Sequence, residues 1–120
     1  MKAVVYDAYG GPEVLEIRDV PIPRPKANEA LIKVDSISLN PVDAKARRGG
    51  FRPLSDLLKF PRITGTDFAG VITETGSGVS GFKVGDVVYG WAQPLLNNGS
   101  AAEMVCISEK AIALAPNNIS

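Results

Sequence analysis

Glycine and proline residues interrupt this chain so often that no long helix or strand fits between them. Twelve glycines and nine prolines are spread over 120 residues, and the short segments between them alternate apolar with polar side chains. Alternation with a period of two is typical of strands that bury one face. The sequence therefore predicts one domain that is mainly β, with many turns and short helices.

The expected strands are short and follow one another closely along the chain. A proline-rich stretch separates the second strand from the third, because each proline ring fixes φ and restricts the residue before it. The predicted strands cover residues 2–7, 15–18, 29–39, 69–75, 84–90, 101–107 and 110–114, with a loop and one turn of helix expected over 51–64 and an exposed loop over 93–100.

The segment 29–39 carries the strongest strand pattern, and its apolar face changes sides. Apolar residues up to Val34 lie on one face, whereas Ile37 and Leu39 fall on the other. An extra residue in one strand of a pair produces such a change of phase. We therefore expect a β-bulge near residues 35–36.

A short helix is predicted directly after this strand. Asn40 suits the N-cap and Pro41 the first helical position, where the missing N–H has no intrahelical partner to lose. Asp43 lies in the first turn and basic residues lie in the last, which both complement the helix dipole. Gly49 or Gly50 supplies the left-handed residue that ends the helix.

The chain has no histidine and a single cysteine, Cys106. Zinc sites need cysteine, histidine and carboxylate ligands, so neither a structural nor an ordinary catalytic zinc is expected. The Ser-His and Cys-His nucleophile pairs are excluded as well. A lone cysteine cannot form an internal disulfide, which favours a reducing compartment, and we expect the cytoplasm. Cys106 itself lies in an apolar strand, where a buried inert thiol is expected.

Charge and hydropathy exclude other classes of partner. Thirteen basic residues balance thirteen acidic ones, so no nucleic acid or anionic membrane surface is expected as a partner. The apolar runs are only a few residues long, which is too short for a membrane-spanning helix.

Two glycine-bracketed segments, 65–72 and 85–90, stand close together in the sequence. Asp67 follows two residues after the first glycine of one, and Asp86 follows the first glycine of the other. The layout resembles a site built to hold a metal ion, but the histidine and cysteine ligands are missing.

Taken in order, the motifs resemble the N-terminal catalytic domain of the medium-chain dehydrogenase/reductase superfamily. The resemblance covers essentially the whole chain, from Lys-Ala-Val-Val-Tyr at residues 2–6 and Gly-Gly-Pro-Glu-Val-Leu at residues 10–15 to Ile-Ala-Leu-Ala-Pro at residues 112–116. Together with Asn-Pro-Val-Asp at residues 40–43, it is greatest with the zinc-free quinone oxidoreductase branch, whose members are zeta-crystallin-like.

This resemblance implies a fold and an activity. Family members fold this region as a GroES-like, partly open β-barrel with short helices, and bind NADPH mainly in a separate Rossmann domain. Residues 1–120 are thus expected to form the substrate-side domain, truncated before a Rossmann domain whose Gly-x-Gly-x-x-Gly fingerprint this chain lacks. The longer protein is expected to reduce quinones or α,β-unsaturated carbonyls with NADPH and without zinc. The chain alone is expected to be inactive.

The zinc-dependent relatives sharpen this assignment. They carry a cysteine at the position of Asn40, a His-Glu pair at Thr66 and Asp67, and a four-cysteine zinc lobe where this chain has the short stretch 91–100. The resemblance therefore implies that the chain holds no metal.

The resemblance also assigns the site residues. Asn40, Asp43 and Lys45 are the expected catalytic residues; Phe51, Thr66 and Trp91 are expected in the substrate pocket; Asn40, Pro41 and Val42 are expected to contact NADPH. Several relatives carry a tyrosine where Lys45 stands and another near Phe51, so two hydroxyl groups of their sites are missing here.

Each assignment has a structural alternative. Asn40 can serve only as a helix cap, Asp43 only as a complement to the helix dipole, and Lys45 only as part of a solvated helix face. Trp91 can anchor its loop rather than line a pocket. Asp67 is expected to preserve the shape of the lost metal site by accepting backbone N–H groups.

Two rival functions are kept open. Phe-Lys-Val-Gly-Asp at residues 82–86 also resembles the co-chaperonin GroES, although no mobile loop with its binding tripeptide is found near residue 25. A reductase-fold binding protein without catalysis is the other rival. The expected partner of the enzyme is a small quinone or enone, and a homodimer is left open.

Overall fold

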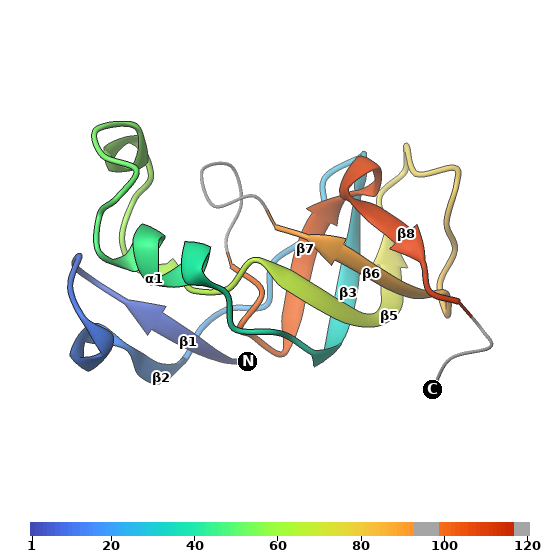
Figure 1. The fold of residues 1–120 in the computed structure, drawn as a ribbon. Coiled ribbons are helices and arrows are strands. Elements are labelled where there is room, and N and C mark those ends of the chain that lie inside the picture. The colour runs from blue at the N-terminus through green and yellow to red at the C-terminus, as the bar shows by residue number, and fades with distance from the viewer. Residues whose placement is uncertain (93–98, 117–120) are drawn as a thin grey trace.

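The computed structural model describes residues 1–92 and 99–116, in which strands outnumber helices (Figure 1). The mainly β class predicted from sequence is confirmed. None of the helices in the described ranges is long and apolar enough to cross a membrane. The strands are β1 (Lys2–Tyr6), β2 (Glu16–Asp19), β3 (Glu29–Ser36), β4 (Arg62–Ile63), β5 (Asp67–Thr75), β6 (Val87–Trp91), β7 (Met104–Ser108) and β8 (Ile112–Leu114); the helices are α1 (Pro41–Arg47) and the 3-10 turns η1 (Pro12–Val14), η2 (Leu54–Leu57) and η3 (Glu109–Ala111).

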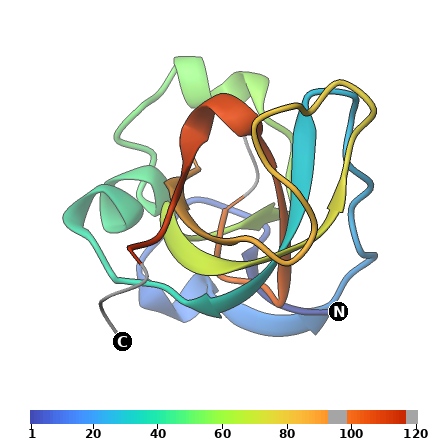
Figure 2. The ribbon, with the colours of Figure 1, turned by 90° about the vertical axis from the view of Figure 1, so that its right-hand side faces the viewer.

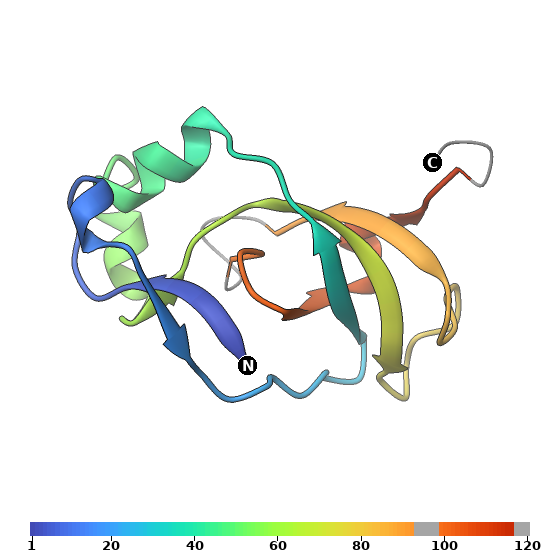
Figure 3. The ribbon, with the colours of Figure 1, turned by 90° about the horizontal axis from the view of Figure 1, so that it is seen from below.

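The strands form two separate antiparallel sheets. One has the order β2-β1-β4 and the other the order β7-β3-β5-β6-β8. An isolated bridge between Ala3 and Ala102 links them. In Figure 2 the strands of the larger sheet curve around a common interior, and Figure 3 shows β1 and β2 set apart from it. The result is the partly open barrel expected from the sequence.

The core lies inside the larger sheet. Ile32, Ile72, Val88 and Ile107 come from four different strands of this sheet and are 0–1% exposed. Phe68 completes the same cluster. Burial of such side chains stabilises the fold by roughly 1.5–3 kcal/mol each, so this cluster fixes the strands that carry the site.

The end of β3 differs from the prediction. The register with β5 shifts between Val34 and Ser36, which confirms the expected bulge, and a second shift between Leu31 and Ile32 was not expected. The strand ends at Ser36 instead of continuing to Leu39, which is 90% exposed. The bulge bends the chain out of the ladder, so the next residues lead toward α1 instead of pairing with β5.

Helix α1 begins and ends as predicted. Asn40 is an extended N-cap with φ −124° and ψ 152°, and it forms a capping box with Asp43. Pro41 is the first helical residue. At the other end Gly49 has φ +84°, a left-handed conformation that favours glycine.

Other boundaries were placed less well from sequence. The two-residue strand β4 falls within the predicted loop over 51–64, and β6 and β7 each start three residues later than expected. Residues 93–98 of the predicted exposed loop lie outside the described part of the chain. Gly99 and Ser100, however, are buried rather than exposed, because both donate hydrogen bonds to the stretch 63–67.

Candidate functional site

The turn at Gly65 places the first site residues. Gly65 has φ +99°, and a Cβ atom there would lie 2.7 Å from Ser100 Oγ, so both backbone conformation and space require glycine. The turn leads from β4 into β5 and sets Thr66 and Asp67 at the start of that strand. The glycine bracket noted in the sequence therefore positions polar groups beside the start of α1.

Asp43 is the buried acceptor of this cluster. Its Oδ2 accepts the backbone N–H of Asn40 at 3.0 Å, and its Oδ1 accepts the Thr66 hydroxyl at 3.1 Å. Asp43 is 8% exposed and Thr66 is 2% exposed. A buried carboxylate needs such donors to offset its lost hydration, and these two join α1 to the entry of β5.

Asp67 is the second carboxylate of the cluster. Its Oδ2 accepts Asn40 Nδ2–H at 2.9 Å, and its Oδ1 accepts the Ser38 backbone N–H at 2.8 Å. The expectation that Asp67 accepts a backbone N–H is confirmed. Among the described residues neither Asp43 nor Asp67 forms an ion pair, so neutral donors alone hold both carboxylates.

Trp91 lies across the strand pair from Asp67. The two residues are register partners at the ends of β5 and β6. The Trp91 side chain is 49% exposed, and the next residue, Ala92, donates its N–H to the Thr66 carbonyl. Beside this pair is an open cavity of about 260 Å³, lined by Ser36, Ile37, Ser38, Asp67, Phe68, Ala69, Tyr89 and Gly90.

Lys45 and Phe51 pair with each other, outside the Asn40 cluster. Lys45 Nζ lies 4.9 Å from the centre of the Phe51 ring, within the range of a cation–π contact. Lys45 is exposed, which agrees with the solvated helix face considered above. The remaining first-turn residues, Pro41 and Val42, are exposed and half-buried respectively.

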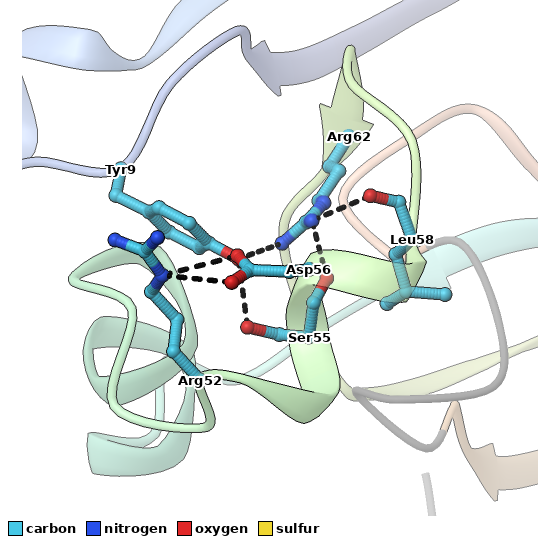
Figure 4. A network of polar contacts seen from close by, with 6 residues as sticks. All are labelled: Tyr9, Arg52, Ser55, Asp56, Leu58 and Arg62. Carbon is cyan, nitrogen blue, oxygen red and sulfur yellow. Dashed lines mark hydrogen bonds and ion pairs between the residues drawn. The ribbon is translucent and has the colours of Figure 1, made fainter.

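A network missed by sequence analysis holds the segment that follows Phe51 (Figure 4). The buried guanidinium of Arg62 donates to the carbonyls of Ser55 and Leu58 at 2.5 and 2.7 Å and to Tyr9 Oη at 3.3 Å. The Tyr9 hydroxyl also donates to Asp56 at 2.8 Å. These contacts join residues up to 53 positions apart, and no local pattern in the sequence indicates them.

One carboxyl of this second network has a shifted pKa. The hydrogen bond from Tyr9 lowers the pKa of Asp56, and the nearby Arg52 guanidinium lowers it further. Arg52 Nε donates to Asp56 Oδ2 at 3.1 Å. Because both residues are exposed, solvent screens the pair and its effect on stability is small.

Cys106 lines a separate cavity that contains none of the predicted site residues. Its volume is about 410 Å³, and its wall includes Val5, Val20, Met104 and Cys106. Cys106 is half-buried rather than fully buried. Burial, with a contribution from Glu29 and Glu74, raises the pKa of its thiol to about 11.

The chemistry of the Asn40 cluster suits hydrogen bonding to a neutral organic ligand. In residues 1–92 and 99–116 no three histidine, cysteine or acidic side chains converge to hold a metal ion. The cluster offers the Asn40 amide, which donates to one carboxylate, and the Thr66 hydroxyl, which donates to the other. Sequence reasoning found Asn40, Asp43 and Thr66, which the fold brings together, but it did not find Ser100, whose hydroxyl donates to the Asp67 carbonyl at 2.7 Å.

Comparison with known proteins shows similarity to one family in both sequence and structure. The alcohol dehydrogenase GroES-like domain matches residues 26–117. A chloroplast envelope quinone oxidoreductase homolog and a chloroplastic NADPH-dependent alkenal/one oxidoreductase, both from Arabidopsis thaliana, are each 42% identical over 99% of this chain and 36% and 32% of their own lengths. The solved quinone oxidoreductase of Coxiella burnetii superposes with a TM-score of 0.91 at 38% identity, over all of this chain and 38% of its own. The chain thus spans about a third of the length of the relatives it matches.

Proposed function

Because the chain belongs to the alcohol dehydrogenase GroES-like domain family, in the quinone oxidoreductase branch of the medium-chain dehydrogenase/reductase superfamily, we propose that it forms the substrate side of an NADPH-dependent reductase. The family and the GroES-like fold expected from the sequence are confirmed. The proposed reaction is hydride transfer from NADPH to a quinone or to the β-carbon of an α,β-unsaturated carbonyl. Solvent supplies the proton that completes the reduced product.

The observation that carries this proposal is the position of the Asn40 side chain. Its amide lies between two carboxylates, with Asp43 bound to the backbone N–H and Asp67 bound to the side-chain nitrogen. A polar group that is fixed in this way, between the end of β3 and the start of α1, can orient a bound ligand without rearranging. The names of the relatives support a quinone or an enone as that ligand.

We assign roles to the other site residues on the same basis. Asp43 positions Asn40 and Thr66, while Pro41 and Val42 form a wall against the nicotinamide end of the cofactor. We assign Trp91 to the β6 side of the substrate pocket, because it is the register partner of Asp67. Lys45 and Phe51 contact each other outside the Asn40 cluster, and their role in substrate binding is proposed from the resemblance alone.

The cofactor supplies the hydride, and this chain supplies orientation. The residues present fit that division of labour, because the Asn40 cluster offers hydrogen bonds but no reducing group of its own. We propose that a second domain makes most of the contacts to NADPH. The 120-residue chain alone should then be inactive. Its binding of NADPH should be too weak to measure by titration calorimetry. Micromolar affinity of this chain for NADPH would contradict that assignment.

We further propose that catalysis needs no zinc. The absence of histidine and the single cysteine carry this proposal, and elemental analysis of the purified protein tests it. A stoichiometric zinc content would overturn it. A cytoplasmic location and a homodimer remain predictions, which fractionation and light scattering would check.

The activity is tested on the whole protein that carries this chain. We expect it to oxidise NADPH in the presence of 1,4-benzoquinone or a short enal. An Asn40→Ala variant is expected to lose at least about tenfold in kcat/KM, as when a positioned polar contact is removed. No oxidation above background with either substrate would reject a reductase function and favour the binding-protein or co-chaperonin alternatives.

A further inference from the structure

We propose that Asp67 is the positioning residue for Asn40, and that it fixes the amide so that one Nδ2 hydrogen faces the ligand. This inference rests on the proposed function and specifies which group of the ligand Asn40 recognises. The contacts of the two residues give the argument in three steps.

The first step is the orientation of the amide. Asn40 Nδ2 lies 2.9 Å from Asp67 Oδ2. A carboxylate only accepts hydrogen bonds, so the flipped amide would place its oxygen against the carboxylate oxygen. The backbone N–H of Asp43 donates to the Asn40 backbone carbonyl at 3.0 Å. The contact with Asp67 is therefore what selects the orientation of the amide.

The second step is the rigidity of Asp67 itself. Its second carboxylate oxygen accepts the Ser38 backbone N–H at 2.8 Å, and its own carbonyl accepts the Ser100 hydroxyl at 2.7 Å. Asp67 also pairs with Trp91 in the β5–β6 ladder. The carboxylate is therefore held by backbone and strand contacts on several sides, and it can fix its neighbour instead of following it.

The third step is the remaining hydrogen-bonding capacity. An amide nitrogen carries two hydrogens, and within the part of the chain that the structure describes only Asp67 accepts from Asn40 Nδ2. Asn40 is half-buried, so its second hydrogen can reach a ligand. That hydrogen is a donor, and it recognises an acceptor such as a ketone, enal or quinone oxygen. The hydrogen bond from this N–H to the ligand oxygen strengthens as negative charge develops on that oxygen.

A spectroscopic experiment on the 120-residue chain tests the positioning without any enzyme activity. We expect the two Nδ2 protons of Asn40 to give separate NMR signals, one of them shifted downfield by the carboxylate. In Asp67→Asn the downfield shift should be lost, while the Asn40 backbone N–H keeps its signal. Asp43→Asn is the matched control, because it should move the backbone signal and leave the downfield Nδ2 signal in place. Unchanged Nδ2 signals in Asp67→Asn would overturn the proposal.

A kinetic cycle on the whole protein tests the role in ligand recognition. Asp67→Asn alone is expected to lower kcat/KM for 1,4-benzoquinone about tenfold, the size of one charge-assisted hydrogen bond. In an Asn40→Ala background the same substitution should have no further effect, because Asp67 acts through Asn40. Fully additive losses would show an independent role for Asp67 and reject the positioning. Absence of activity in the wild type would reject the proposed function and leave the NMR result standing.

Discussion

Two polar networks of opposite construction flank helix α1 along the chain, one at its start and one in the segment that follows it. At its start, the side chain of Asn40 and the hydroxyl of Thr66 donate to the carboxylates of Asp67 and Asp43. Beyond its end, the buried cation of Arg62 donates to backbone carbonyls and a tyrosine hydroxyl. The first network is therefore centred on carboxylate acceptors, and the second is centred on a guanidinium donor.

The difference determines what each network can do. The guanidinium of Arg62 is 7% exposed and stacks 4.1 Å from the Phe60 ring, so its charge is enclosed by protein. Its Nε is buried and has no hydrogen-bond partner among the described residues. The Asn40 cluster borders open space at Asp67. We propose that the Arg62 network stabilises the fold and the Asn40 network serves the site, and three experiments test this division.

The largest effect on stability is expected from Arg62→Met. The substitution leaves the carbonyls of Ser55 and Leu58 buried without their donor, which should cost about 3 kcal/mol of unfolding free energy. Urea denaturation measures it. Arg52→Met is the matched control, because the contacts of Arg52 with Asp56 and with the Tyr9 ring are exposed and their loss should cost less than about 0.5 kcal/mol. Equal midpoints for both variants would refute the structural role of Arg62.

A smaller loss is expected from Gly65→Ala on the other side of the comparison. A Cβ there meets both a left-handed φ and atoms of Ser100 and Ala101 at 2.7 and 2.9 Å, and we expect a loss of about 2 kcal/mol. Gly85→Ala is the control, since Gly85 also has a left-handed φ of +95° but nothing lies within 4 Å. It should cost about 1 kcal/mol. If the two variants lose equal stability, the close packing around Gly65 contributes nothing.

Tyr9→Phe should change the titration of the Asp56 carboxyl more than it changes the free energy of unfolding. The Tyr9 hydrogen bond is the main reason that the pKa of Asp56 lies below its ordinary value of 3.8, so the variant should raise this pKa toward 3.8. Because the folded-state pKa is lowered, the stabilisation is present above pH 3.8 and lost as pH falls through the folded pKa. Carbon-detected NMR of the Asp56 carboxyl follows the titration. An unchanged Asp56 titration in Tyr9→Phe would show that the hydroxyl does not reach it in solution.

The smallest effect concerns Cys106, which belongs to neither network. Its raised pKa of about 11 means that iodoacetamide labelling should keep accelerating above pH 9, where glutathione levels off. The unfolded thiol loses its proton first, so unfolding becomes more favourable as pH rises from about 9 to about 11. Cys106→Ser should remove the Cys106 contribution to that pH dependence and leave the contribution of Tyr6, whose pKa is also raised by burial. A labelling rate that levels off near pH 9 would place the thiol in water.

The sequence was most informative where the signal was local. The N-cap at Asn40, the left-handed Gly49 and the bulge near Ser36 all follow from neighbouring residue types, and all were predicted correctly. The acceptor role of Asp67 was also expected. The family resemblance matched Asn40 and the Thr66-Asp67 pair to the ligands of one metal site, and the structure joins Asn40 to Asp67.

The features that sequence missed depend on distant contacts. Strand β4 is only two residues long and forms because Tyr6 and Val5 of β1 pair with it, so no periodicity reveals it. Ser100 looked like part of a polar surface loop, yet its hydroxyl binds a carbonyl 33 residues away. Tertiary pairing overrides local composition in both cases.

The anchoring of Ala92 and Gly99 bears on engineering of this scaffold. Ala92 donates to the carbonyl of Thr66, and Gly99 donates to that of Ile63. Both residues are therefore fixed to one short stretch of backbone at the entry of β5. Gly99 in particular cannot carry a side chain, because a Cβ atom there would lie 2.1 Å from the Thr64 carbonyl oxygen, so a redesigned scaffold should keep both anchors unchanged.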